Sequence, residues 1–114
     1  MSKNRNFLDS VPAVNRGITF IPGENGADGR LEIVHEGWAD KLVQKLFHKP
    51  RVTVVKLERF GSFIWGTMDG ERSIFEIAGA VLARFGEEAE PLYERLAGYF
   101  QMLHKNGYVS WKRS

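Results

Sequence analysis

The strongest strand signal in this chain is Val52-Thr53-Val54-Val55-Lys56-Leu57. Its β-branched residues lose little side-chain freedom in an extended backbone, so the stretch predicts a β-strand. Directly after it the spacing of apolar residues changes from two to about 3.6, which predicts a helix. The apolar side of that helix consists of Phe60, Phe63, Ile64, Trp65 and Met68. Asp69-Gly70 ends it, because glycine adopts the left-handed backbone of a helix end without strain.

Two more helices and a short strand are predicted downstream. Ser73 and Glu76 have the spacing of a capping box, so a second helix begins at Ser73 and runs until Gly86. Its predicted apolar face consists of Ile74, Ile77, Ala78, Val81, Leu82 and Phe85. Glu87 to Pro91 favours the start of a third helix, whose inner face holds Leu92, Leu96, Tyr99, Phe100 and Leu103. Residues 108–111 then predict a short strand or wing.

Two strands and a short helix are predicted upstream. Residues 18–21 and 30–35 read as strands that pair antiparallel across the glycine-rich loop 22–29. A short helix over 38–48 follows, with Lys41, Gln44 and Lys45 on its wet side. Its apolar stripe consists of Trp38, Leu42, Val43, Leu46 and Phe47.

The predicted fold class is therefore α+β. A three-stranded antiparallel sheet is followed by three helices, with an extra short helix before the third strand. Residues 1–16 show no sustained periodicity beyond one turn of helix, and are expected to form an N-terminal arm beside a single domain of residues 17–114.

Composition narrows the class of protein. The chain has 114 residues, a formal net charge of +2 and no cysteine, so disulfides, thiolate metal ligands and a cysteine nucleophile are excluded. No apolar run approaches the ~18 residues of a membrane span, and no signal-peptide pattern follows Met1. A cytoplasmic protein that does not enter a membrane is the expectation.

No motif for catalysis is present. His35, His48 and His104 are scattered and lack the spacing of a metal site. No serine lies in a nucleophile elbow, and the glycine loop leads into a strand rather than into a phosphate-binding helix. We expect no catalytic residue, no metal and no cofactor.

Three helices followed by a short strand are also the outline of a winged helix-turn-helix, so DNA binding has to be weighed. A recognition helix needs Arg, Lys, Asn or Gln along its exposed face. Residues 73–85 offer only Arg84, with Arg72 just before. This composition disfavours DNA as the partner.

An ordered set of residues from Leu57 to Val109 resembles the PqqD-like proteins, the recognition elements of ribosomally made and modified peptides. The resemblance covers about half of the chain. The matching residues are Leu57-Glu58, Gly61, Ile64-Trp65, Asp69-Gly70, Ser73-Ile74, Glu76-Ile77, Leu82, Phe85, Leu96, Leu103 and Gly107-Tyr108-Val109. The resemblance implies a winged-helix-like fold and a peptide-binding chaperone rather than an enzyme. Its partners would be the leader of a precursor peptide and a modifying enzyme, often a radical S-adenosylmethionine enzyme.

The resemblance also implies a site. The leader would lie antiparallel along the third strand, in a groove closed by the last helix, where an edge strand offers main-chain hydrogen bonds. The strand residues are Val52, Val54, Val55, Lys56 and Leu57, and the helix residues are Tyr93, Leu96, Ala97, Phe100 and His104. Arg51, Lys56 and Arg59 could attract an acidic leader, although such charges also protect an edge strand from aggregation. Packing of the sheet and helix on each other is the other interpretation of these residues.

Two features depart from the family pattern. The helix over 38–48 intervenes before the third strand, where it could cover the sheet or alter which edge is free, and Glu58 stands where Asn or Asp is commoner. Asn6-Phe7-Leu8-Asp9 itself looks like a leader determinant, so the arm could occupy its own groove or that of a second copy in a homodimer. A winged-helix DNA-binding protein and a structural assembly subunit are the alternative functions.

Overall fold

The computed structural model describes residues 7–24, 28–35, 38–48 and 51–112. Within these ranges the chain is an α+β protein with small antiparallel sheets and four α-helices, in agreement with the predicted class. The chain forms two compact units, one of residues 16–66 and one of residues 1–15 together with 67–114. Each unit has a sheet of its own.

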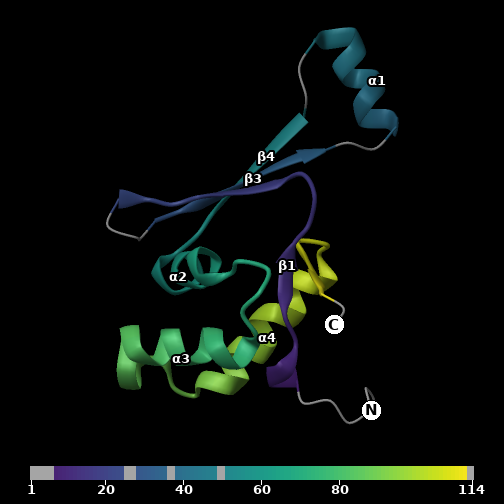
Figure 1. Cartoon of the computed structure of the whole chain (residues 1–114). Helices are drawn as coiled ribbons and strands as arrows, with labels where there is room; N and C mark the ends of the chain where they lie inside the picture. The colour runs from purple at the N-terminus through teal and green to yellow at the C-terminus, as the bar shows by residue number, and fades with distance from the viewer. Residues whose placement is uncertain (1–6, 25–27, 36–37, 49–50, 113–114) are drawn as a thin grey trace. The chain divides into compact units, whose positions relative to one another are not determined.

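The unit of residues 16–66 is built on a three-stranded antiparallel sheet (Figure 1). Strand β2 (Ile18–Ile21) pairs with β3 (Arg30–His35), and β3 pairs with β4 (Arg51–Lys56). The antiparallel pairing of the first two predicted strands is thereby confirmed. The third predicted strand begins one residue earlier than expected, and Leu57 lies after its end.

Helix α2 (Arg59–Thr67) follows β4, and all of its residues except Thr67 belong to this unit. The ring of Phe20 on β2 stacks on Trp65 of α2 with 6.5 Å between centroids. Gly29 approaches α2 so closely that an added Cβ would lie 2.6 Å from Ser62 Oγ. The Gly29 N–H donates to that hydroxyl at 3.2 Å. The side chain of Leu31 is 1% exposed, which identifies the face carrying Phe20 and Leu31 as the inner face of the sheet.

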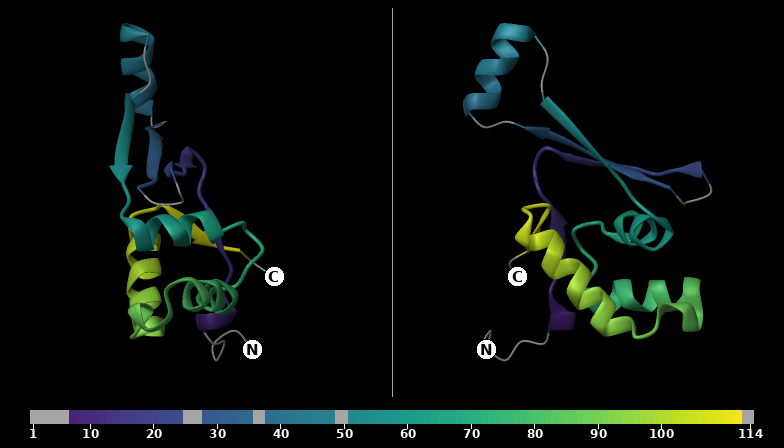
Figure 2. Two further views of the ribbon diagram at one scale, coloured as in Figure 1. Left: turned by 90° about the vertical axis from the view of Figure 1, so that its left-hand side faces the viewer. Right: turned by 180° about the vertical axis from the view of Figure 1, so that it is seen from behind.

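Helix α1 (Trp38–Phe47) connects β3 to β4, as predicted. It lies beyond the ends of these two strands in every view (Figures 1 and 2). Two residues of the predicted apolar stripe, Leu42 and Leu46, are not on a covered side of the helix but are 51% and 65% exposed. These two side chains therefore remain largely in water, although α1 lies next to the ends of β3 and β4 (Figure 1). Lys41, Gln44 and Lys45 are exposed, as predicted.

The second unit contains helices α3 (Ile74–Phe85) and α4 (Leu92–Lys105). The predicted capping box is confirmed, because the Glu76 N–H donates to Ser73 Oγ and the Ser73 N–H donates to Glu76 Oε1. Leu82, however, does not belong to the buried face and is 45% exposed. It stands one residue, about 100° around the helix, past buried Val81.

The segment before α4 also differs from the prediction. Residues Gly86–Ala89 form the short 3-10 helix η4, and Pro91 is the N-cap of α4 rather than part of its first turn. The core residues predicted on the last helix are confirmed in part. Leu92, Leu96, Phe100 and Leu103 are buried, whereas Tyr99 is half-buried.

A strand that the sequence did not predict lies in the expected arm. After the 3-10 turn η2 (Phe7–Asp9), β1 (Pro12–Val14) pairs antiparallel with β5 (Val109–Trp111), the predicted final strand. Pro12 is buried. The segment is further fixed by the Ile74 N–H, which donates to the Ser10 carbonyl at 2.8 Å.

Candidate functional site

Strand β4 is one edge of the three-stranded sheet. The strand order is β2-β3-β4, and no other strand among the described residues pairs with the outer side of β4. An edge strand exposes main-chain N–H and C=O groups at every second residue. The residues at which these groups point outward follow from the hydrogen bonds between β4 and β3.

One hydrogen bond fixes which β4 residues face inward. The Leu57 N–H donates to the Gly29 carbonyl at 2.8 Å, one step beyond the Arg30–Lys56 pair of the ladder. Hydrogen-bonded pairs alternate along an antiparallel ladder. The N–H and C=O groups of Val55 and Thr53 therefore point toward β3.

The hydrogen bonding between β3 and β2 leads to the same assignment of inward and outward residues. There the Val34 N–H donates to the Gly17 carbonyl at 2.8 Å, so Val34 faces β2 rather than β4. Its partner across the β3–β4 ladder, Val52, consequently has its backbone groups on the free edge. Val54 and Lys56 share this orientation. Three predicted site residues thus carry the outward-facing backbone of β4.

The same three residues also share one face of the sheet, because side chains alternate between faces along a strand. Val52 is 47% exposed and Val54 is 53% exposed, and Lys56 is exposed as well. Val55 projects from the inner face and is half-buried, and Leu57 is half-buried beyond the strand. The structure therefore separates the five predicted strand residues into an outer row of three and two inner ones.

The residues predicted on the last helix lie on α4, in the other unit. Tyr93 is 50% exposed, and the exposed His104 stacks on Trp111 with 5.7 Å between ring centroids. Ala97 is half-buried. Leu96 and Phe100 are completely buried, which agrees with the interpretation of these two residues as core.

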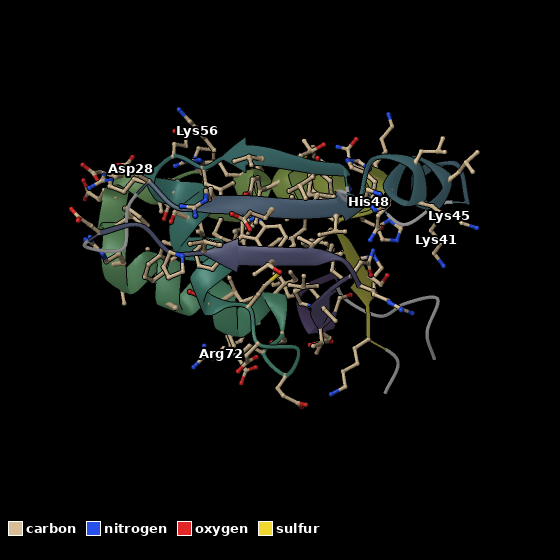
Figure 3. The ribbon with its side chains drawn as sticks, turned by 90° about the horizontal axis from the view of Figure 1, so that it is seen from above. Asp28, Lys41, Lys45, His48, Lys56 and Arg72 are labelled. Carbon is tan, nitrogen blue, oxygen red and sulfur yellow. The ribbon has the colours of Figure 1, made fainter. Side chains whose placement is uncertain are left out.

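The other polar side chains considered in the sequence have structural contacts. His35 Nε2 lies 2.6 Å from Thr53 Oγ1. His48, just after α1, forms a shallow depression of about 550 Å³ with Lys41, Gln44 and Lys45. Figure 3 shows that Lys41, Lys45 and His48 gather around α1, whereas Lys56 lies at the far end of the sheet. Among the described residues, no cluster of three or more His, Asp or Glu side chains could hold a metal ion.

Two residues beside the outer row were not among the predicted site residues. Arg30 and Glu32 of β3 lie directly across from Lys56 and Val54. The Arg30 Nε is 3.3 Å from Glu32 Oε2. Their alternation with Leu31 and Ile33 was visible in the sequence, but only the register places them opposite particular residues of β4.

These features place the chain among small α+β proteins whose sheet ends in an edge strand, with backbone groups that no other described strand pairs with. More narrowly, the chain belongs to the PqqD family. The family model described as "Coenzyme PQQ synthesis protein D (PqqD)" matches residues 46–109, which is more than half of the chain. The matched segment begins in the last turn of α1 and contains β4, α2, α3 and α4. A comparison with curated proteins and one with solved structures gave no match.

The match confirms the resemblance drawn from Leu57 to Val109. It leaves β1, β2, β3 and most of α1 outside the matched segment. Within the described residues no helix is long and apolar enough to cross a membrane.

Proposed function

We propose that this chain is a non-catalytic chaperone that captures the leader of a ribosomally made precursor peptide. The leader adds to β4 as an extra strand, and the bound peptide is presented to a modifying enzyme such as a radical S-adenosylmethionine enzyme. The family's description as a coenzyme synthesis protein supports a role in biosynthesis.

One observation carries the proposal: the outward backbone groups of Val52, Val54 and Lys56 on an exposed edge. An extended peptide satisfies such groups with main-chain hydrogen bonds, while its alternate side chains contact the strand. The side chains of Val52 and Val54 offer apolar surface at the same place. On α4, the exposed Tyr93 and His104 and the half-buried Ala97 are the proposed further contacts, with Leu96 and Phe100 as core beneath them.

We take α2, α3, α4 and β5 as a winged-helix-like scaffold that serves peptide binding and does not read DNA. Helix α3 would have to present polar side chains to a groove. Instead its exposed surface includes Phe75, which is 59% exposed, and Leu82. Such a surface does not favour the DNA-binding alternative.

The test is an amide NMR titration with the precursor peptide encoded beside the gene. Strand addition predicts shifts concentrated in residues 52–57, and the proposed contacts on α4 predict further shifts in residues 93–104. Shifts confined to residues 18–21, on the other edge of the sheet, would contradict the assignment to β4.

Val54→Pro tests the main-chain contact itself. Proline removes the outward N–H of Val54 without removing a hydrogen bond to β3, so the sheet should stay folded. The peptide loses one hydrogen bond, and we expect its affinity to fall about tenfold. Val54→Ala is the matched control, because it retains the N–H and trims only the side chain. Wild-type affinity in folded Val54→Pro would refute strand addition at β4.

A further inference from the structure

In the outer row Val52, Val54 and Lys56, the side chains as well as the backbone are available to contact a peptide. Each of its residues combines an outward backbone with an exposed side chain on the outer face of the sheet. A peptide strand paired with β4 places a side chain directly beside each member of the row, on the same face. A peptide on β4 would therefore present every second side chain to this row.

The charges at one end of the row are unbalanced. Lys56 lies directly across from Arg30, and like charges in that position destabilise a pair of strands. The Arg30 side chain is bound to Glu32. Lys56 has no carboxylate partner among the described residues. An acidic peptide residue beside Lys56 would supply that partner and offset the repulsion.

The other end of the row is apolar. Val52 and Val54 leave about half of their surface in water, on an edge strand where exposed apolar side chains favour association with another strand. β-branched or aromatic residues beside them form stabilising cross-strand pairs. The row thus has two apolar positions and one cationic position, each separated by one residue.

We infer that β4 selects peptides with the pattern acidic, any, apolar, any, apolar, written from the peptide's N-terminus. This order holds for an antiparallel peptide, which is the more stable pairing per residue. The acidic residue lies beside Lys56, and the two apolar residues lie beside Val54 and Val52. The inference rests on the proposed strand addition and adds the class of peptide to it.

Three capped synthetic peptides of identical composition test the pattern. The in-phase peptide is Ser-Glu-Thr-Val-Thr-Val-Ser. The out-of-phase peptide, Ser-Glu-Val-Thr-Val-Thr-Ser, places its carboxylate and its valines on opposite faces. The reversed peptide, Ser-Val-Thr-Val-Thr-Glu-Ser, keeps one face and inverts the order. Affinities come from amide shifts of residues 52–57 in the full chain, and the in-phase peptide should bind about fivefold more tightly than the others.

A charge reversal tests the contact with Lys56. In Lys56→Glu the preference should invert, so that an in-phase peptide with Lys in place of Glu binds more tightly than the original. Lys105→Glu changes the net charge by the same amount on exposed α4 and should leave the preference unchanged. Equal loss of affinity in both variants would overturn the specific contact, because it would reflect net charge alone.

The remaining outcomes separate this inference from the proposed function. Equal binding of all three peptides at β4 would refute the pattern and leave strand addition standing. Tightest binding of the reversed peptide would overturn the antiparallel order. If the precursor peptide shifts β4 and none of the three does, only the pattern fails. If neither the precursor nor these peptides shift β4, both proposals fail.

Discussion

At the scale of single residues, one carboxylate organises the turn between α2 and α3. Asp69 Oδ1 accepts hydrogen bonds from the N–H groups of Glu71 at 2.9 Å and Arg72 at 2.8 Å. These bonds, first that of Glu71 and then that of Arg72, hold the pKa of Asp69 below its ordinary value of 3.8. The nearby Arg72 charge acts in the same direction, whereas desolvation opposes it.

This lowered pKa makes the contribution of Asp69 depend on pH. A carboxylate whose pKa is lower in the folded state stabilises that state above its unfolded pKa, and the effect disappears as pH falls through the folded pKa. Asp69→Ala should be less stable than the wild type at neutral pH. The difference should shrink below pH 3.8. Urea unfolding over an acidic pH series measures it, and a gap that stays constant through the series would be the contrary result.

Ser73 offers a second test at the same scale, because its hydroxyl accepts the Glu76 N–H at 3.2 Å. Ser73→Ala removes this acceptor and should lower the free energy of unfolding by about 1 kcal/mol. Ser73→Asp retains an acceptor and should remain close to the wild type. Chemical denaturation of the three proteins provides the comparison, and equal stability of the Ala variant would show that the cap contributes nothing.

At the scale of elements, local patterns predicted the helices and strands well where the signal lies within a few residues. The capping box at Ser73 and the β-branched run of β4 are of this kind. The prediction failed for Leu42 and Leu46 because the spacing of apolar residues shows which side of α1 is apolar, but not whether that side is covered. The same distinction applies to the candidate site. The position of β4 could be predicted from its own residues, whereas the outer row depends on the register with β3, which pairs residues distant in sequence.

The alternation along β4 has a direct consequence for hydrogen exchange. The amides of Val52, Val54 and Lys56 face the free edge and should exchange quickly in the free protein. Those of Thr53 and Val55 bond to β3 and should be protected. Residue-resolved exchange by NMR measures both sets. Protection of the first set in the free protein would mean that another chain segment or a second copy already covers the edge.

At the scale of the whole molecule, the two ends of the described chain meet in one unit. β1 pairs with β5, and Phe7 packs edge-on against Trp111 with 5.9 Å between ring centroids. Trp111 also contacts Phe100 and His104 of α4. No local pattern could predict β1, because a three-residue strand has almost no periodicity and its partner lies at the other end of the sequence. Asn6, which completed the suggested leader-like motif, lies outside the described residues.

Proline substitutions in β1 can measure how much the pairing of β1 with β5 contributes to the free energy of unfolding. The Asn15 N–H donates to the Tyr108 carbonyl and the Lys112 N–H to the Val11 carbonyl, so the Ala13–Ser110 pair between them is also hydrogen-bonded. Pro12 and Val14 have their nitrogens on the outer edge of β1, which explains why proline is tolerated at position 12.

Ala13→Pro should therefore break the ladder where Val14→Pro does not. The first substitution removes a donor and leaves the Ser110 carbonyl without its partner, which should cost about 1–3 kcal/mol of unfolding free energy. The second loses only a valine side chain that is 40% exposed, so its cost should be smaller. Urea unfolding with tryptophan fluorescence compares the two, since Trp111 lies in β5. If both prolines cost the same, pairing of the chain ends is not what stabilises this unit.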